Sequence, residues 1–126
     1  MSGITYLTDA WIITAVVSSA TGQSEKMLLS ARDLGARGAL GHSARGFGAR
    51  ERFGVLGLAV ETEKDVIQVL VSEEQRDIVF EAMYKAGGLD RPDGGFMYLT
   101  PIEKMATFIP ESMLATLKSG GEGGSA

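Results

Sequence analysis

Two glycine-rich segments contain the residues best suited to hold an anion. The first reads RGFGARER and places three arginines, Arg45, Arg50 and Arg52, among glycines. Glycine lets a backbone approach a ligand closely, and guanidinium groups bind phosphate or carboxylate through paired hydrogen bonds. A solvated loop whose arginines pair with nearby glutamates would have the same composition, so the residues alone leave both interpretations open.

The second segment is DRPDGG, from Asp90 to Gly95. Successive backbone N–H groups in such a bend can form a concavity that binds an anion. Proline and Asp-Gly are also sufficient for a plain tight turn, which is the alternative reading. The segment is not a Walker A loop, because no Gly-Lys-Ser/Thr follows it.

Composition excludes several other kinds of site. The chain has no cysteine and one histidine, His42, so disulfides, thiolate ligands, cysteine nucleophiles and a zinc site with several histidines from one chain are excluded. We assign no catalytic residue and no metal site, and do not expect an enzyme. The net charge of −4 argues against a nucleic-acid partner. No apolar run is long enough to cross a bilayer and no signal peptide is recognisable, so we expect a cytoplasmic protein.

The 126 residues predict one domain, residues 1–118, followed by a flexible tail, SGGEGGSA, at 119–126. Hydrophobic patterning predicts strands at 9–18, 38–45, 65–71 and 96–99, with a short fifth strand within 104–109. Helices are expected from Ser24 to Leu34 and from Ser72 to Gly87, with the two serines as N-caps and Gln75 or Glu74 completing the second cap. Gly46–Glu61 fits no single period and is expected to be a long loop.

This order predicts an α+β fold, a ferredoxin-like βαββαβ sandwich with a long loop between the second and third strands. Both helices would then cover one face of the sheet. The strand DVIQVLV is apolar on both faces, since Val66 and Val69 cannot point the same way. An apolar outer face on a small domain predicts self-association.

Three segments in this order resemble the PII signalling protein superfamily, over residues 10–109. ARGFGAR at 44–50 is similar to the K-G-F-G-R-Q string that opens the family's T-loop, and EKDVIQVLV at 63–71 to the strand that closes it. GGLDRPDGGFMYLTPIEK at 87–104 is similar to the family's B-loop and following strand. The resemblance implies a ferredoxin-like homotrimer that binds adenine nucleotides between subunits and docks on target proteins through the T-loop.

Carried over position by position, the resemblance implies a nucleotide site with contributions from several segments. The family's B-loop lysine is matched by Gly95. The two arginines of the family's last strand have no counterpart, and the corresponding segment here offers only Lys104. The resemblance therefore favours AMP or ADP over ATP. The implied nucleotide-binding residues are Gly38, Ala39, Leu40, Gly46, Phe47, Gly48, Lys64, Asp93, Gly94 and Gly95, and charge adds Arg45, Arg50, Arg52 and Arg91 as anion contacts.

The leading hypothesis is a PII-like trimeric sensor that regulates a partner through the Gly46–Glu61 loop. The resemblance suggests a membrane transporter as the partner, with a link to inorganic carbon and bicarbonate. Two alternatives stay open on the same fold: a ligand-free trimeric assembly module, and a small acylphosphatase-like hydrolase with Arg50 and Arg52 as its anion cradle.

Overall fold

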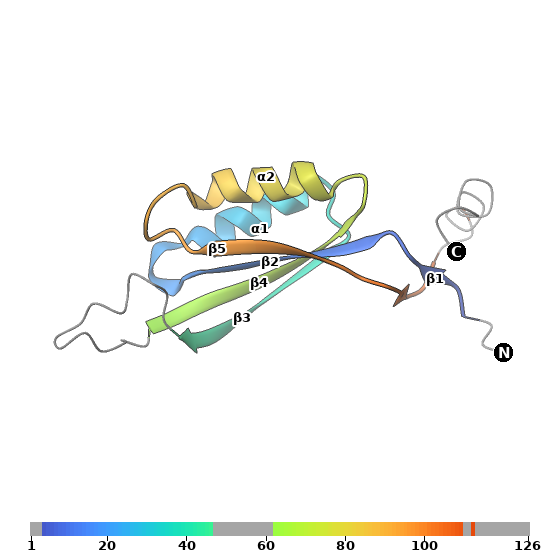
Figure 1. Ribbon diagram of the computed structural model, residues 1–126, viewed down its shortest axis with the longest axis horizontal. Helices are drawn as coiled ribbons and strands as arrows, with labels where there is room; N and C mark the ends of the chain where they lie inside the picture. Colours follow the sequence, from blue (N-terminus) through green and yellow to red (C-terminus); the bar gives the residue numbers. More distant parts are fainter. Residues whose placement is uncertain (1–3, 47–61, 110–111, 113–126) are drawn as a thin grey trace.

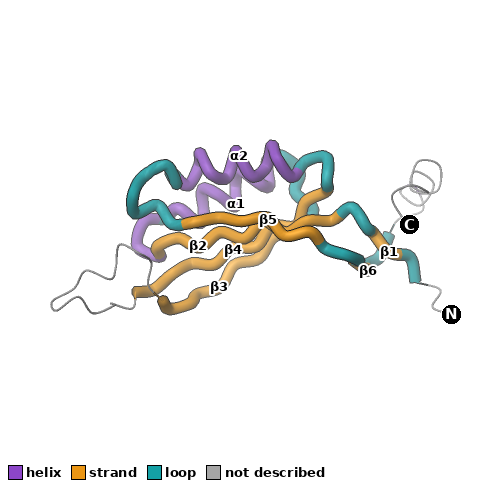
Figure 2. Tube along the Cα trace, viewed as in Figure 1, coloured by secondary structure: helices purple, strands orange, loops and turns teal. Residues whose placement is uncertain are grey.

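The computed structural model describes residues 4–46, 62–109 and 112, and its main body is a four-stranded sheet with two helices on one face (Figures 1 and 2). The strand order is β3-β4-β2-β5, and every pair is antiparallel. The elements of this body are β2 (Ala10–Ser18), the short helix η1 (Ser19–Thr21), α1 (Gln23–Asp33), β3 (Gly38–Gly46), β4 (Thr62–Ser72), α2 (Arg76–Gly87) and β5 (Phe96–Pro101).

Each helix connects two strands that are not neighbours in the sheet. Helix α1 links β2 to β3, and α2 links β4 to β5, so the two βαβ units interleave in the order β3-β4-β2-β5. This is the ferredoxin-like topology, and the predicted α+β fold is confirmed. The long loop was expected between the second and third strands of this unit, which are β3 and β4; residues 47–61 of that loop lie outside the described residues.

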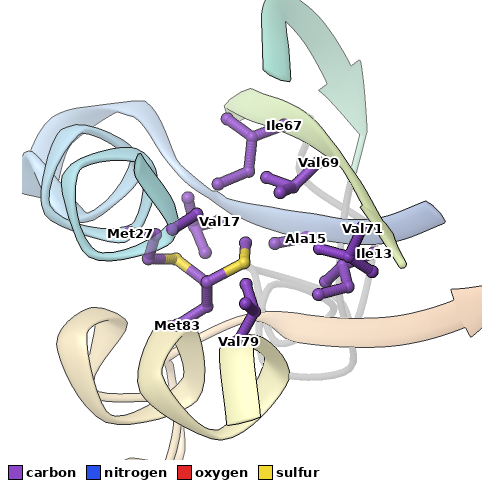
Figure 3. Close-up of a cluster of buried hydrophobic side chains, with 10 residues drawn as sticks. Ile13, Ala15, Val17, Met27, Ile67, Val69, Val71, Val79 and Met83 are labelled. Carbon is purple, nitrogen blue, oxygen red and sulfur yellow. The ribbon is translucent and has the colours of Figure 1, made fainter. Parts of the chain in front are cut away.

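The core lies between the sheet and the helices (Figure 3). Side chains alternate along a strand, so Ile13 and Val17 of β2 point towards the helices, as does Val69 of β4, which pairs with Ile13. Met27 and Met83 reach this layer from α1 and α2, and both are fully buried. Burying such a side chain stabilises the fold by about 1.5–3 kcal/mol, which explains why these two layers pack together.

The predicted N-caps are only partly right. Helix α1 begins after Gly22, whose φ of 72° is left-handed, and Ser24 does not cap it, so that prediction is wrong. The predicted pair Ser72 and Gln75 does exchange hydrogen bonds, with Gln75 N 3.3 Å from Ser72 Oγ and Ser72 N 2.9 Å from Gln75 Oε1. The regular helix nevertheless begins at Arg76 with Gln75 as its N-cap, because residues 73–75 form a turn, so the prediction of Ser72 as the N-cap is wrong.

The C-terminal strands also differ from the prediction. Strand β5 includes Pro101, which was expected to end it; as an edge strand it tolerates the missing N–H. Of the predicted strand 104–109, only β6 (Met105–Ala106) forms. It pairs with β1 (Tyr6–Leu7), a strand too short to predict from its sequence, in a separate two-stranded sheet. Residues 119–126 lie outside the described residues, so the tail stays a prediction.

Candidate functional site

One end of the sheet brings together the two segments singled out for anion binding. Strand β3 ends at Gly46 and β4 begins at Thr62 there, and the α2–β5 loop returns to the sheet at the same end (Figure 1). The register places Lys64 of β4 opposite both Ala44 of β3 and Ser18 of β2. The predicted residues Gly46 and Lys64 therefore share this end with the loop that carries Asp93–Gly95.

The glycines of the α2–β5 loop are required by its packing. Gly95 has a φ of 103°, and a Cβ there would overlap the carbonyl oxygen of Val16 and lie 3.1 Å from Val17 Cα. Gly94 is buried, and its Cβ would lie 2.8 Å from both Gly88 O and Leu89 Cα. The loop therefore lies too close to β2 for a lysine at position 95, whereas Asp93 is exposed.

Gln23 holds the two ends of this loop together. Its side chain is 4% exposed, and its Nε2 donates to Gly87 O at 2.6 Å and to Gly94 O at 2.9 Å. The Thr21 hydroxyl donates to Gln23 Oε1, so the side-chain amide has partners at both its oxygen and its nitrogen. Nothing in the local sequence indicated this role, because both carbonyls lie more than sixty residues away along the chain.

Arg91 is anchored to the end of α2. Its Nε donates to Gly88 O at 3.1 Å, and Gly88 is the C-cap of that helix. A cation at this position is favourable because the last carbonyls of a helix carry partial negative charge. The contact gives Arg91 a structural role and keeps its charge in the loop that contains Asp93–Gly95.

The root of the long loop is tied to the start of α1 by Asp65. Its carboxylate accepts from Ser19 Oγ at 3.0 Å and from Ser24 Oγ at 2.7 Å. Asp65 lies three residues after Thr62, where β4 begins. Sequence reasoning missed this cluster, since Ser24 had been interpreted as a helix cap.

The arginines of the first segment are mostly beyond the described residues. Arg45 is exposed on β3, directly opposite Glu63 of β4. Phe47, Gly48, Arg50 and Arg52 lie within 47–61, outside the described residues. The predicted anion contacts of that segment are therefore located only through Arg45.

Gly38, Ala39 and Leu40 lie on β3, at the edge of the sheet opposite to β5, the strand into which the α2–β5 loop runs. Gly38 pairs with Leu70 and Leu40 with Gln68, whereas Gly46 pairs with Thr62. All three residues are exposed on β3, which is an edge strand. One chain therefore does not bring the two parts of the predicted site together.

The face of the sheet opposite the helices is mostly apolar, and none of the described helices or strands packs on it. We call it the helix-free face, and it carries the residues that alternate with the core: Ile12, Thr14, Val16, Leu40, His42, Val66, Gln68, Leu70, Phe96 and Tyr98. Leu40 is 57% exposed, Phe96 54% and Tyr98 48%. The rings of Phe96 and Tyr98 stack with their centroids 6.4 Å apart. This confirms the apolar outer face expected from the sequence.

The best-defined ion pair lies away from the loops. Arg37, in the α1–β3 turn, binds both carboxylate oxygens of Asp9 at 3.0 and 2.9 Å. The hydrogen bonds from Arg37 lower the pKa of Asp9.

Among residues 4–46 and 62–109, no three acidic or histidine side chains are grouped to hold a metal ion, and no helix there is both long and apolar enough to cross a bilayer.

Comparison with known proteins identifies the fold. No family profile and no curated protein matches the chain at the sequence level. Among solved structures, Arabidopsis thaliana PII bound to citrate is 16% identical with a TM-score of 0.59, over 76% of this chain and 79% of that one. The GlnK–ATP complex of B. subtilis is 19% identical with a TM-score of 0.60, over 82% and 85%. A DUF3240 family protein from Shewanella baltica OS155 is 10% identical with a TM-score of 0.61, over 82% and 100%.

Identities this low establish the fold alone. The three matches span at least three quarters of each chain, and they include two proteins named as PII or GlnK. The suspected structural resemblance is confirmed: this chain has a PII-like fold.

Proposed function

We propose that the chain is a PII-like signalling protein, a cytoplasmic homotrimer that binds AMP or ADP between subunits and regulates a partner protein rather than catalysing a reaction. The observation that carries the proposal is the preformed α2–β5 loop, in which Gly94 and Gly95 pack too tightly for any side chain. This loop corresponds to the family's B-loop, to which the resemblance assigns phosphate binding.

Assembly follows from the helix-free face. Its exposed Leu40, Phe96 and Tyr98 form an apolar surface that self-association would remove from water. A second copy would also supply what one chain lacks, since Gly38–Leu40 lie on the edge strand β3 and the α2–β5 loop runs into the other edge strand, β5. A cleft between copies can unite them, so the nucleotide site depends on the oligomer.

The nucleotide proposal rests on the loop and on the cations beside it. The backbone N–H groups of Asp93 and Gly95 would bind a phosphate, since that of Gly94 already donates to Arg91 O. Arg91 in the same loop and Lys64 at the same end of the sheet are nearby positive charges. Gly95 replaces the family's lysine, which removes one phosphate contact and favours AMP or ADP over ATP. The GlnK neighbour was solved with ATP, which supports an adenine nucleotide as the ligand class.

The partner is proposed to dock on the loop Gly46–Glu61, which leaves the sheet beside this site. Ligand binding at the root of a long loop can change the surface that the loop offers to another protein. The resemblance to the PII superfamily suggests a membrane transporter as the partner and bicarbonate as a second ligand of this protein. Adding bicarbonate to each nucleotide titration tests that second ligand, and unchanged affinities would contradict it.

Sedimentation and calorimetry together test the proposal. We expect the wild-type protein to sediment as a trimer and to release heat with ADP or AMP. Tyr98→Glu should give monomers that no longer bind, because it places a charge in the apolar face at a residue outside the proposed nucleotide site. Ile78→Glu is the matched control, since Ile78 is 59% exposed on α2, away from the helix-free face through which we propose assembly.

Two outcomes would overturn the proposal: a wild-type monomer, or a trimer that gives no heat with either nucleotide. The second outcome would instead favour a ligand-free assembly module, which the helix-free face also allows. That alternative predicts a melting temperature that no nucleotide raises, because a ligand that binds only the native state must stabilise it.

A further inference from the structure

The α2–β5 loop depends on one side chain that lies outside it. The loop runs from Gly87, the last residue of α2, to the start of β5 at Phe96. Its backbone must reverse direction between a helix and a strand, and the carbonyls of Gly87 and Gly94 both turn inward to Gln23. A single buried amide group thus fixes the separation between the two ends of the loop.

We infer that Gln23 is the positioning residue of the proposed phosphate loop: by holding Gly87 O and Gly94 O together, it fixes the backbone that carries the N–H groups of Asp93 and Gly95, whereas the N–H of Gly94 donates to Arg91 O. This inference rests on the proposed function for its ligand, whereas the loop geometry itself can be tested without one. Among the described residues, the side-chain hydrogen bonds of Gln23 go to the two loop carbonyls and to Thr21, so its effect on a ligand would pass through the loop.

Burial makes the two contacts matter. Gln23 is 4% exposed, so without its Nε2 the carbonyls of Gly87 and Gly94 would lose their donor in a place that water reaches poorly. An unsatisfied buried acceptor is costly, and the loop would move to expose these oxygens to solvent. Gly94 and Gly95 cannot follow without disturbing close contacts with Leu89 and Val16. The N–H groups of Asp93 and Gly95 would then be displaced.

The chain offers a matched control at the other end of the sheet. Gln75 has the same bonding pattern, because its Nε2 donates to two carbonyls, Gly35 O at 3.2 Å and Leu34 O at 3.5 Å, while its Oε1 accepts from Ser72 N. A leucine at either position removes two donors and one acceptor at nearly constant size. Only Gln23 touches the α2–β5 loop.

The experiment compares wild type, Gln23→Leu and Gln75→Leu by amide hydrogen exchange and by calorimetry with ADP. Gln23→Leu should speed exchange of the amides of residues 88–95. It should also weaken ADP binding about tenfold, which corresponds to the loss of about one hydrogen bond in binding free energy. Gln75→Leu should leave both unchanged and speed exchange near Gly35. If Gln23→Leu does not fold, Thr21→Val serves instead, because it removes the hydroxyl that bonds the side chain and the N–H of Gln23 and also Ser18 O. It should shift both readouts in the same direction.

The failures of the two proposals are distinguishable. If the wild type binds neither ADP nor AMP, the proposed function fails, and exchange of the loop in the ligand-free variants still decides whether Gln23 positions it. If the wild type binds ADP but Gln23→Leu shows wild-type exchange and affinity, the role of Gln23 is overturned. Equal loosening of residues 88–95 in Gln23→Leu and Gln75→Leu would also overturn it, since that result would reflect a general loss of stability.

Discussion

Replacing Gly95 with alanine is expected to destabilise the protein by about 2–5 kcal/mol. Two costs add. A left-handed φ of 103° costs a residue with a Cβ about 1–2 kcal/mol. The new Cβ would also overlap Val16 O and press on Val17, and forcing atoms into a packed region costs about 1–3 kcal/mol more.

Gly35→Ala separates these two costs. Gly35 has a φ of 82°, yet a Cβ there meets nothing within 4 Å, so this variant has the backbone cost alone, about 1–2 kcal/mol. Urea unfolding can be followed through the fluorescence of Trp11, the one tryptophan of the chain. All variants must be compared at one protein concentration, because assembly would add to the apparent stability.

The comparison has a clear refuting result. If Gly95→Ala and Gly35→Ala lose the same free energy of unfolding, the loop does not press on β2 as the structure shows. The glycine at position 95 would then reflect backbone conformation only, and the argument that this loop excludes the family's lysine would fail.

Two further predictions concern the ion pair and the loop root. Because the pKa of Asp9 is lowered, its contribution to stability is present above the ordinary carboxyl value of 3.8 and is lost as the pH falls through the lowered value. Asp9→Asn should therefore cost about 0.5–1 kcal/mol of unfolding free energy at neutral pH, and wild type and variant should become equally stable in acid. Urea unfolding midpoints measured across that pH range check this. A constant difference at every pH would contradict the role of Arg37. Asp65→Ala should cost about 1–3 kcal/mol because the hydroxyls of Ser19 and Ser24 lose their acceptor, while Asp65→Asn, which keeps one acceptor oxygen, should cost less in the same assay. Equal losses in the two Asp65 variants would show that the hydroxyl contacts do not stabilise the fold.

Local patterns were sufficient for the elements of the main body. The β-branched run of β2 and the apolar repeats of α1 and α2 reflect burial along a single segment, which a sequence displays directly. The order of those segments then limited the topology to the ferredoxin-like arrangement that the structure has. Ser24 was misassigned because a serine before an apolar run usually caps its helix, whereas here its hydroxyl is used by Asp65, forty-one residues away.

For the candidate site too, local features were predictable from the sequence and long-range contacts were not. Residue types and a period of two are local properties, and they were enough to predict that Asp93–Gly95 forms a bend and that the strand at 65–71 is apolar on both faces. Three features emerge only in the folded structure: the hydrogen bonds of Gln23 to that bend, the approach of Gly95 to Val16 O that leaves no room for a Cβ, and the position of Leu40 on the edge strand opposite to β5. Such relations join residues distant in the chain, and their strength comes from exclusion of water and close contact, neither of which exists until the sheet and helices pack.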